Sequence, residues 1–236
     1  MIQLGALHYS EQRAMFLAPH ADDETLGCAG VIQKYIRHGS PVRIVIASFA
    51  LSDSKRYRKE ENGYGTYSGM KRINELKEAM CLLGVTDYHI LYPDHTGKQL
   101  YDSRLDRIPR VELVAKLEHH VEEFRPTILY IPSITKHQDH EALHQAAMAV
   151  SRPYFWNGTV LVYETDGELA FQPNLYIPLT EEAMNLKMKT LEAYKTQIGS
   201  LRHPVHPDSL LHKAKFRGNQ IYEEFAEAFQ VIRLRG

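Results

Sequence analysis

The sequence has only two cysteines, Cys28 and Cys81, among its 236 residues. Two thiols in a chain of this length are too few for the disulfide framework that stabilises small secreted proteins. We therefore expect a protein of a reducing compartment, the cytoplasm. Cys28 falls inside a predicted helix and Cys81 on an apolar helix face, so we expect both in the core as small apolar residues.

The sequence also lacks an excess of charge of either sign and any long apolar run. Its 28 basic and 29 acidic side chains give a formal net charge of −1, which offers no electrostatic basis for binding nucleic acid or an anionic membrane. No window approaches the roughly 20 apolar residues of a membrane span. The N-terminal residues do not follow the pattern of a secretion signal. We expect a soluble protein without a membrane span.

The sequence does contain an alternation of short apolar runs with helical patterns, which is typical of βαβ units on a mostly parallel sheet. The predicted strands cover residues 14–19, 42–48, 88–93, 127–133 and 158–165. The predicted helices cover residues 24–39, 70–85, 110–124, 139–150 and 180–197. We thus expect an α/β fold with helices on both faces of the sheet, a less regular C-terminal part, and one domain over residues 1–236.

Two stretches do not fit this alternation. Residues 49–69 are polar, rich in Gly and Tyr, and too long for a plain connection, so they are a candidate lid or binding loop. Residues 203–212, HPVHPDSLLH, contain three histidines and two prolines, and we expect a surface connection there rather than a second metal site.

Histidines and acidic residues cluster directly after two of the predicted strands. The first strand runs into Pro-His-Ala-Asp-Asp-Glu, which contains His20 and Asp23, and the fourth is followed by His-Gln-Asp-His, which ends at His140. Ligands of α/β sheets bind at the carboxyl ends of the strands, so these side chains are expected at one shared edge. Two imidazoles and one carboxylate form a three-ligand set that leaves positions for water and substrate at a catalytic zinc ion.

Roles then follow for the neighbouring polar residues. Asp22 lies beside a ligand without having to be one, so we expect it to take a proton from the attacking water as general base. His137, three residues before His140, is placed to stabilise an oxyanion, with Asp139 orienting its ring. His144, one helical turn after His140, also has a chelating spacing, but the three-ligand set is complete without it.

Helix capping is the alternative explanation of the first motif. Asp22, Asp23 and Glu24 are all favourable at a helix N-terminus, through hydrogen bonds to backbone N–H groups and through the macrodipole. Taken alone, the first motif favours capping, and the second is equally compatible with a solvated loop. Both motifs together, at the ends of strands in one sheet, favour the metal site.

The two motifs resemble those of a known family. APHADDE is similar to the (A/S)HPDDE motif, and HQDH to the HxDH motif, of the LmbE/PIG-L-like zinc-dependent N-acetylglucosaminyl de-N-acetylases. Weaker similarities follow in the family's order, in RINELKEAMCLLGV, LYPD, KMKTLEAYKTQ and EEFAEAF. The resemblance implies a Rossmann-like fold, a zinc cofactor, and removal of the acetyl group from an N-acetylglucosamine-type amino-sugar conjugate. It also implies that Arg72 and Asp94 contact sugar or phosphate groups.

The chain departs from the family motif at one position, where Ala21 replaces the usual proline. Proline fixes φ, so alanine makes this turn less pre-organised but removes no ligand. The sequence does not determine the group to which the amino sugar is linked. A homo-oligomer is compatible with the sequence, and the ligand set suits either zinc or ferrous iron.

Two other functions are compatible with the same residues. Two histidines and one carboxylate also bind the metal of non-haem Fe(II) oxygenases, although nothing in the sequence indicates a clamp for a co-substrate carboxylate. A non-catalytic sugar-binding protein would keep the fold but would need neither Asp22 nor His137.

Overall fold

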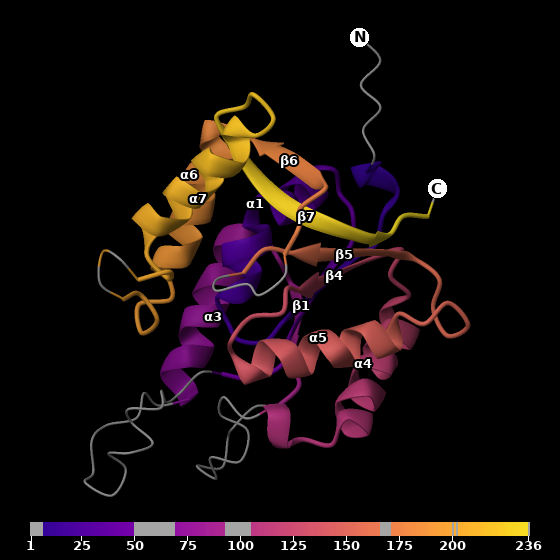
Figure 1. The fold of residues 1–236 in the computed structure, drawn as a ribbon. Coiled ribbons are helices and arrows are strands. Elements are labelled where there is room, and N and C mark those ends of the chain that lie inside the picture. The colour runs from indigo at the N-terminus through magenta and orange to yellow at the C-terminus, as the bar shows by residue number, and fades with distance from the viewer. Residues whose placement is uncertain are drawn as a thin grey trace, which may run out of the picture.

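The computed structural model describes residues 7–49, 69–92, 105–165, 171–199, 201 and 203–235, and Figure 1 shows their arrangement. The sheet has seven strands: β1 (Ala14–Ala18), β2 (Val42–Ile46), β3 (Asp87–Ile90), β4 (Ile128–Pro132), β5 (Thr159–Tyr163), β6 (Leu175–Leu179) and β7 (Phe225–Arg233). The helices are α1 (Asp23–Arg37), α3 (Gly69–Leu83), α4 (Arg110–Phe124), α5 (Gln138–Val150), α6 (Glu181–Glu192) and α7 (Pro207–Asn219), with 3-10 turns η1 (Tyr9–Glu11) and η3 (Leu105–Arg107).

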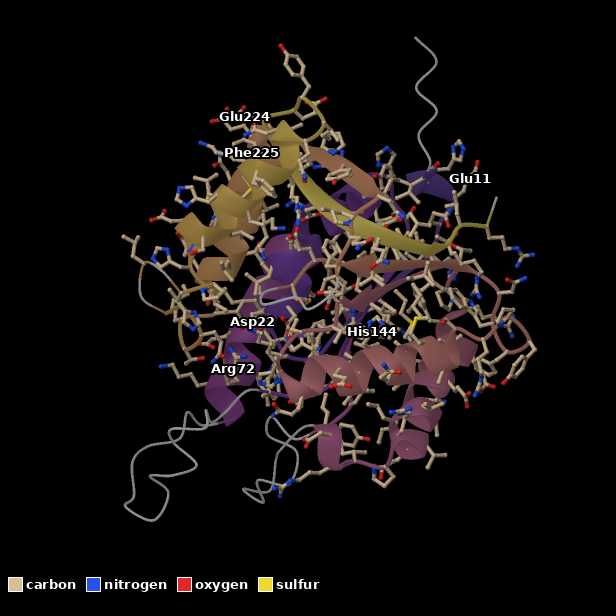
Figure 2. All side chains as sticks on the ribbon, viewed as in Figure 1. Glu11, Asp22, Arg72, His144, Glu224 and Phe225 are labelled. Atoms are coloured by element: carbon tan, nitrogen blue, oxygen red, sulfur yellow. The ribbon has the colours of Figure 1, made fainter. Side chains whose placement is uncertain are left out.

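The strand order is β3-β2-β1-β4-β5-β7-β6. Strands β1 to β5 run parallel, whereas β7 is antiparallel to both of its neighbours. From β1 the chain builds outward through β2 and β3, then returns to the other side of β1 for β4 and β5. Open α/β sheets bind ligands at the carboxyl ends of the two strands flanking such a reversal, here β1 and β4. Figure 2 shows Asp22 and Arg72 on this side of the sheet and Glu11 on the opposite side.

Helices cover both faces of the sheet, which confirms the predicted α/β class. Helices α1, α3, α6 and α7 lie on one face, and α4 and α5 lie on the other (Figure 1). Each face has its own apolar core. Strands β1, β2, β4 and β5 are buried at every position, which explains why their sequences are mostly apolar and do not alternate with polar residues; the charged exception is Arg43 in β2, which pairs with Asp87 and Glu123.

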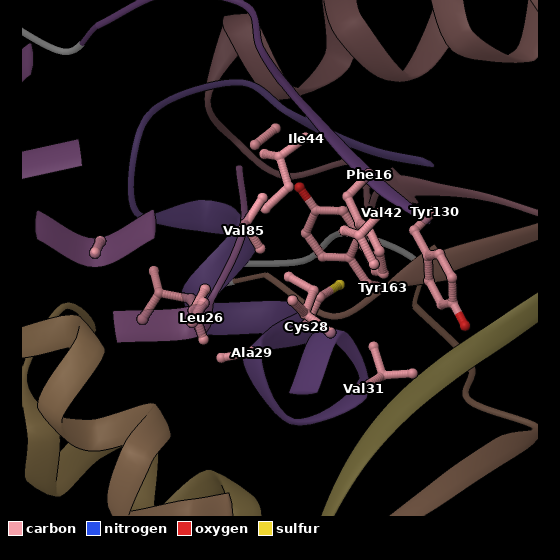
Figure 3. Close-up of a cluster of buried hydrophobic side chains, with 14 of the residues drawn as sticks. Phe16, Leu26, Cys28, Ala29, Val31, Val42, Ile44, Val85, Tyr130 and Tyr163 are labelled. Carbon is pink, nitrogen blue, oxygen red and sulfur yellow. The ribbon is translucent and has the colours of Figure 1, made fainter. Parts of the chain in front are cut away.

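Aromatic rings fill the core between α1 and the sheet (Figure 3). Phe16 stacks on Tyr130 with ring centroids 4.3 Å apart. The buried hydroxyls have partners, because Tyr163 donates to a backbone carbonyl of β1 at 2.8 Å and Tyr130 shares a 2.8 Å hydrogen bond with Tyr35. A Cβ atom at Gly27 would lie 2.2 Å from the Tyr163 ring, so this close approach of helix to sheet requires glycine.

Three local expectations differ from the structure. The stretch 203–212 is no plain connection, because α7 begins at Pro207, where a missing N–H costs no hydrogen bond, and His206 caps it by accepting a backbone N–H. The helix expected to reach residue 197 ends at Glu192. Cys28 is buried as expected, whereas Cys81 is exposed.

The candidate loop 49–69 falls outside the described residues except at its two ends. Among the helices of the described ranges, none has both the length and the apolar composition needed to cross a membrane.

One buried carboxylate ties the C-terminal strand to the first helix. Glu227 of β7 accepts the backbone N–H groups of Gly30 and Val31 in α1, at 2.7 and 2.8 Å. The same carboxylate pairs with Lys187 of α6 at 2.6 Å, and both side chains are almost fully buried. A charge in this position is stable only while its partners remain, because the surrounding protein cannot solvate it.

We expect Lys187→Met to destabilise the fold by about 3 kcal/mol or more, since it leaves the Glu227 carboxylate buried without its cation. The matched control is Arg37→Met, which removes an exposed cation lying 3.9 Å from Glu182 and should cost less than about 1 kcal/mol. Urea unfolding followed by circular dichroism measures both free energies. Equal effects of the two substitutions would show that the buried pair contributes no more than the surface one.

Candidate metal centre

The turn between β1 and α1 has a strained backbone at Asp22. Its φ of 151° and ψ of −28° lie in a region that residues with a Cβ atom rarely adopt, at a cost of order 1–3 kcal/mol. Two hydrogen bonds hold the turn in this conformation. The Asp22 N–H donates to Glu24 at 3.0 Å, and Arg72 donates to the carbonyl of Ala21 at 2.8 Å.

Glu24 is fully buried and serves as the anchor of this turn. Its carboxylate also accepts hydrogen bonds from the hydroxyls of Tyr194 at 2.6 Å and Thr25 at 2.7 Å. Burial raises the pKa of Glu24, although these hydrogen bonds oppose the shift. Tyr194 follows α6, so a residue from the C-terminal part of the chain supports the first motif.

Arg72 lies beneath the same turn and is fully buried. Besides binding Ala21, its guanidinium donates to Glu75 at 3.2 Å and to Thr196 at 3.3 Å. Thr196 in turn donates its hydroxyl to Glu75 at 2.6 Å. Arg72 therefore positions the motif in this structure, and its contact with a sugar or phosphate group stays a prediction. The other such residue, Asp94, lies outside the described residues.

The side chains of His20, Asp23 and His140 meet at the carboxyl ends of β1 and β4. One potential ligand atom from each lies within 4.8 Å of the other two, and all three residues are buried. The Oδ2 atom of Asp23 is 3.6 Å from Nδ1 of His20 and 3.4 Å from Nε2 of His140. Two imidazole nitrogens and one carboxylate oxygen at this spacing fit a divalent metal with open positions for water and substrate.

The Asp139 carboxylate contacts the candidate ligand His20 and is not hydrogen-bonded to the ring of His137, which was expected to be its partner. Nε2 of His20 donates to Oδ2 of Asp139 at 2.8 Å, and the N–H of Leu105 donates to Oδ1 at 2.9 Å. This leaves Nδ1 of His20 directed toward Asp23. A carboxylate bound to the second nitrogen of a ligand histidine is the usual means of fixing its tautomer and orientation.

His137 is only half-buried and stands beside this group of three. Its ring centroid lies 4.9 Å from that of His20 and 5.5 Å from that of His140. It forms the N-cap of α5, because Nδ1 accepts the backbone N–H of Asp139 at 3.2 Å. A second set of three potential ligands, His20, His137 and Asp139, also lies within 4.8 Å. His144 faces away, with Nδ1 donating to the carbonyl of Pro132 at 2.8 Å.

Burial and close charges shift the pKa values across the centre. Burial alone would lower the pKa of His20, but the carboxylates of Asp139 and Asp23 raise it to about 10. Burial opposes ionisation of Asp23, yet the nearby imidazoles of His140 and His20 lower its pKa to about 2. Burial and the charge of Asp23 hold the pKa of Asp22 well above its usual range. Burial, followed by the charge of His20, lowers the pKa of His137 to about 4.

The capping explanation holds for only one of the three acids. Asp22 occupies the N-cap position of α1, but its side chain makes no capping hydrogen bond. Asp23 faces the histidines and accepts the backbone N–H of His20 at 3.1 Å, before the helix begins, whereas Glu24 accepts the N–H of the N-cap residue Asp22. The supporting residues Glu24 and Tyr194 were missed as parts of the site, because their contact spans 170 positions of sequence.

A family model matches more than half of the chain. The model describes PIG-L, GlcNAc-PI de-N-acetylase, and the match covers residues 15–151, which include both motifs.

Individual proteins extend this similarity. The 1D-myo-inositol 2-acetamido-2-deoxy-alpha-D-glucopyranoside deacetylase of Mycobacterium sp. (strain KMS) is 29% identical over 158 residues, which are 61% of this chain; the chain thus spans 51%, about half, of that relative's length. The solved N,N'-diacetylchitobiose deacetylase of Pyrococcus horikoshii superposes with a TM-score of 0.71 and 21% identity, covering 95% of this chain and 85% of that one. GalB, the 4-carboxy-2-hydroxymuconate hydratase of Pseudomonas putida KT2440, has a TM-score of 0.72 at 14% identity, covering 95% and 98%. These structural similarities show the fold alone.

The hydrogen bond from Tyr194 to Glu24 predicts a stability effect. Tyr194→Phe should lower the free energy of unfolding by about 1–3 kcal/mol, because it leaves a buried carboxylate with one donor fewer. Tyr154→Phe is the control, since Tyr154 is 83% exposed and its hydroxyl has access to water. Urea titrations of both variants measure the difference. If Tyr194→Phe unfolds like the control, Glu24 does not depend on this hydroxyl.

Proposed function

Because the chain belongs to the PIG-L (GlcNAc-PI de-N-acetylase) family, we propose that it is a metal-dependent hydrolase that removes the acetyl group from an N-acetylglucosamine-type conjugate and releases acetate. The observation that carries this proposal is the buried set of His20, Asp23 and His140 with Asp22 beside it. The set lies at the carboxyl ends of β1 and β4, where this topology places a ligand.

We assign the metal to His20, Asp23 and His140 rather than to the set that contains Asp139. The Asp139 carboxylate already accepts hydrogen bonds from His20 and from Leu105, whereas Asp23 faces both imidazoles. The donor set suits zinc, with ferrous iron as the alternative. When bound, such an ion polarises the acetyl carbonyl and lowers the pKa of the attacking water from above 15 to about 7.

Asp22 is the proposed general base. It is buried beside Asp23, and no capping hydrogen bond engages its side chain. The strained turn sets the direction of the Asp22 side chain. Glu24 binds the N–H of Asp22, and Arg72 binds the carbonyl of Ala21, the residue before it. As water attacks the acetyl carbon, the Asp22 carboxylate accepts the proton. The protonated carboxyl then donates it to the departing nitrogen, so the C–N bond breaks to give acetate and a free amine.

His137 is the proposed oxyanion donor. Its Nδ1 atom accepts the Asp139 N–H, so in the neutral ring the proton is on Nε2. A pKa near 4 keeps the ring neutral at physiological pH. Its partial exposure leaves it accessible to substrate, unlike the ligand histidines. Nε2–H can then donate to the oxygen that gains charge as the tetrahedral intermediate forms.

The two rival functions have less support. An Fe(II) oxygenase uses the same ligand types, but the family match favours a hydrolase. A non-catalytic sugar-binding protein would not require an acid in the strained position of Asp22 beside the ligand set. The cytoplasmic location and the oligomeric state stay predictions.

Metal binding is tested by elemental analysis of the purified protein and of two histidine variants one helical turn apart. We expect about one equivalent of zinc or iron, in keeping with a single three-ligand site. His140→Ala should lose it, whereas His144→Ala should retain it because His144 is hydrogen-bonded to Pro132 instead. A folded protein that takes up no metal would contradict the assignment.

The base is tested by comparing two adjacent aspartates. Asp22→Asn should keep the metal and lower kcat for acetate release by roughly 10²–10⁴-fold, the usual contribution of general acid–base catalysis. Asp23→Asn should lose both metal and activity. Acetate release from a panel of N-acetylglucosamine conjugates, with metal content measured on the same samples, separates the two effects. Full activity in Asp22→Asn would mean that another group accepts the proton.

A further inference from the structure

A second group of histidines lies at the edge of the sheet, between β3 and α4. Strand β3 is the outermost strand on its side and is separated from β1 by β2. Asp87 and His89 are two positions apart in β3, so their side chains point to the same face of the sheet. His120 of α4 lies against this face, with its ring centroid 4.9 Å from that of His89. None of these residues belongs to the candidate metal centre.

The His120 side chain is buried and has a nitrogen without a partner. The residue is only 9% exposed, and its Nδ1 atom makes no hydrogen bond among the described residues. Nearly all buried polar atoms in proteins are paired, so an unpaired one indicates a missing ligand. A bound water or a metal ion would supply that partner.

His89 presents a nitrogen that is suited to a metal. Its Nε2 atom donates a hydrogen bond to Oδ1 of Asp87 at 2.8 Å. A neutral imidazole has one N–H, so Nδ1 of His89 keeps its lone pair. A carboxylate bound to the far nitrogen of a histidine is the usual support of a metal ligand, and the pairing of Asp139 with His20 is of the same kind.

The charges around the two rings favour a cation. Arg43 pairs with Asp87 at 3.0 Å and with Glu123 at 2.6 Å, so the two carboxylates exceed the guanidinium by one negative charge. Burial, followed by the charges of His89 and Arg43, lowers the pKa of His120 to about 4. The His120 ring is therefore neutral at physiological pH, which is the form that binds a metal.

We propose that His89 and His120 form a second metal site, the edge site, which takes a zinc-type transition-metal ion and completes its coordination with water. Imidazole suits zinc, copper and nickel. Zn–N bonds of about 2.0–2.1 Å place two ligand nitrogens within about 4 Å of each other, which rotation of rings with centroids 4.9 Å apart provides. The ion would join the edge strand to α4. This proposal does not depend on the proposed hydrolase.

The edge site has two protein ligands, so it binds more weakly than the three-ligand centre. The purified protein then keeps about one equivalent of metal, and the edge site fills only when metal is added.

Zinc titration by calorimetry tests the edge site in the wild type and in His140→Ala, which is expected to lack the first metal. We expect about two sites in the wild type and about one in His140→Ala. His120→Phe keeps a ring but removes both nitrogens, and in either background it should weaken the edge site about 100-fold or more, as should His89→Ala. The matched control is His119→Ala, because His119 is exposed beside His120, and it should leave the affinity unchanged.

Thermal unfolding provides a second readout. Zinc at about 100 times its Kd should raise the Tm of His140→Ala by about 5 °C or more, and adding His120→Phe or His89→Ala should remove this increase. Circular dichroism confirms that each variant folds, and His89→Ala decides the outcome if His120→Phe does not. Equal zinc affinity in the edge variants and the control would mean that other surface histidines bind the ion. A titration that fills no site beyond the first centre would leave the His120 nitrogen to a buried water. Either result would overturn the edge site and leave the hydrolase assignment untouched.

Discussion

The hydrogen bond between His20 and Asp139 joins the two halves of the candidate site. The residues are 119 positions apart, one after β1 and the other in the first turn of α5, and their side-chain atoms lie 2.8 Å apart. Because β1 and β4 are adjacent and parallel, the segments that follow them emerge side by side. This hydrogen bond fixes the orientation of the His20 ring. With Nε2 bound to Asp139, Nδ1 is the nitrogen that faces Asp23. The Asp139 carboxylate also accepts the N–H of Leu105, so a third segment, η3, contributes to the orientation of the His20 ring.

In the candidate centre, the potential metal ligands and the residues that restrain the backbone are different side chains. His20, Asp23 and His140 present potential ligand atoms within 4.8 Å of one another. Glu24 and Arg72 are buried beneath them and restrain the backbone on both sides of Asp22. A strained backbone conformation persists only where surrounding contacts hold it in place. Here the contacts are the hydrogen bonds from the Asp22 N–H to Glu24 and from Arg72 to the Ala21 carbonyl. Ala21 replaces the proline of the family motif, which would restrict φ at this position. The hydrogen bond from Arg72 to the Ala21 carbonyl restrains the same part of the turn.

Much of the fold was predictable because local patterns and tertiary structure agree. The helix over 110–124 was predicted with its observed bounds, since Pro109 precedes it and Arg125 and Pro126 follow. Convergence of the two motifs followed from strand-end geometry. What the sequence did not reveal depends on contacts distant in sequence: the His20 partner of the Asp139 carboxylate, the hydrogen bond from Arg72 to Ala21, and the hydrogen bond from Tyr194 to Glu24. The helix that begins at Pro207 does not follow from the sequence pattern for a different reason: proline and histidine together are typical of loops, although proline is also favourable at the first helical position.

The candidate metal ligands and the residues that restrain them lie in different parts of the sequence, which sets the order in which they are synthesised. All three candidate metal ligands precede residue 141, within the region that the family model matches. Tyr194, Thr196, Lys187 and Glu227, which brace the first turn and the first helix, all come later. During synthesis from the N-terminus, the ligands therefore leave the ribosome before the residues that restrain them. Glu227 of β7, the last strand, is thus among the last residues to become available to restrain α1.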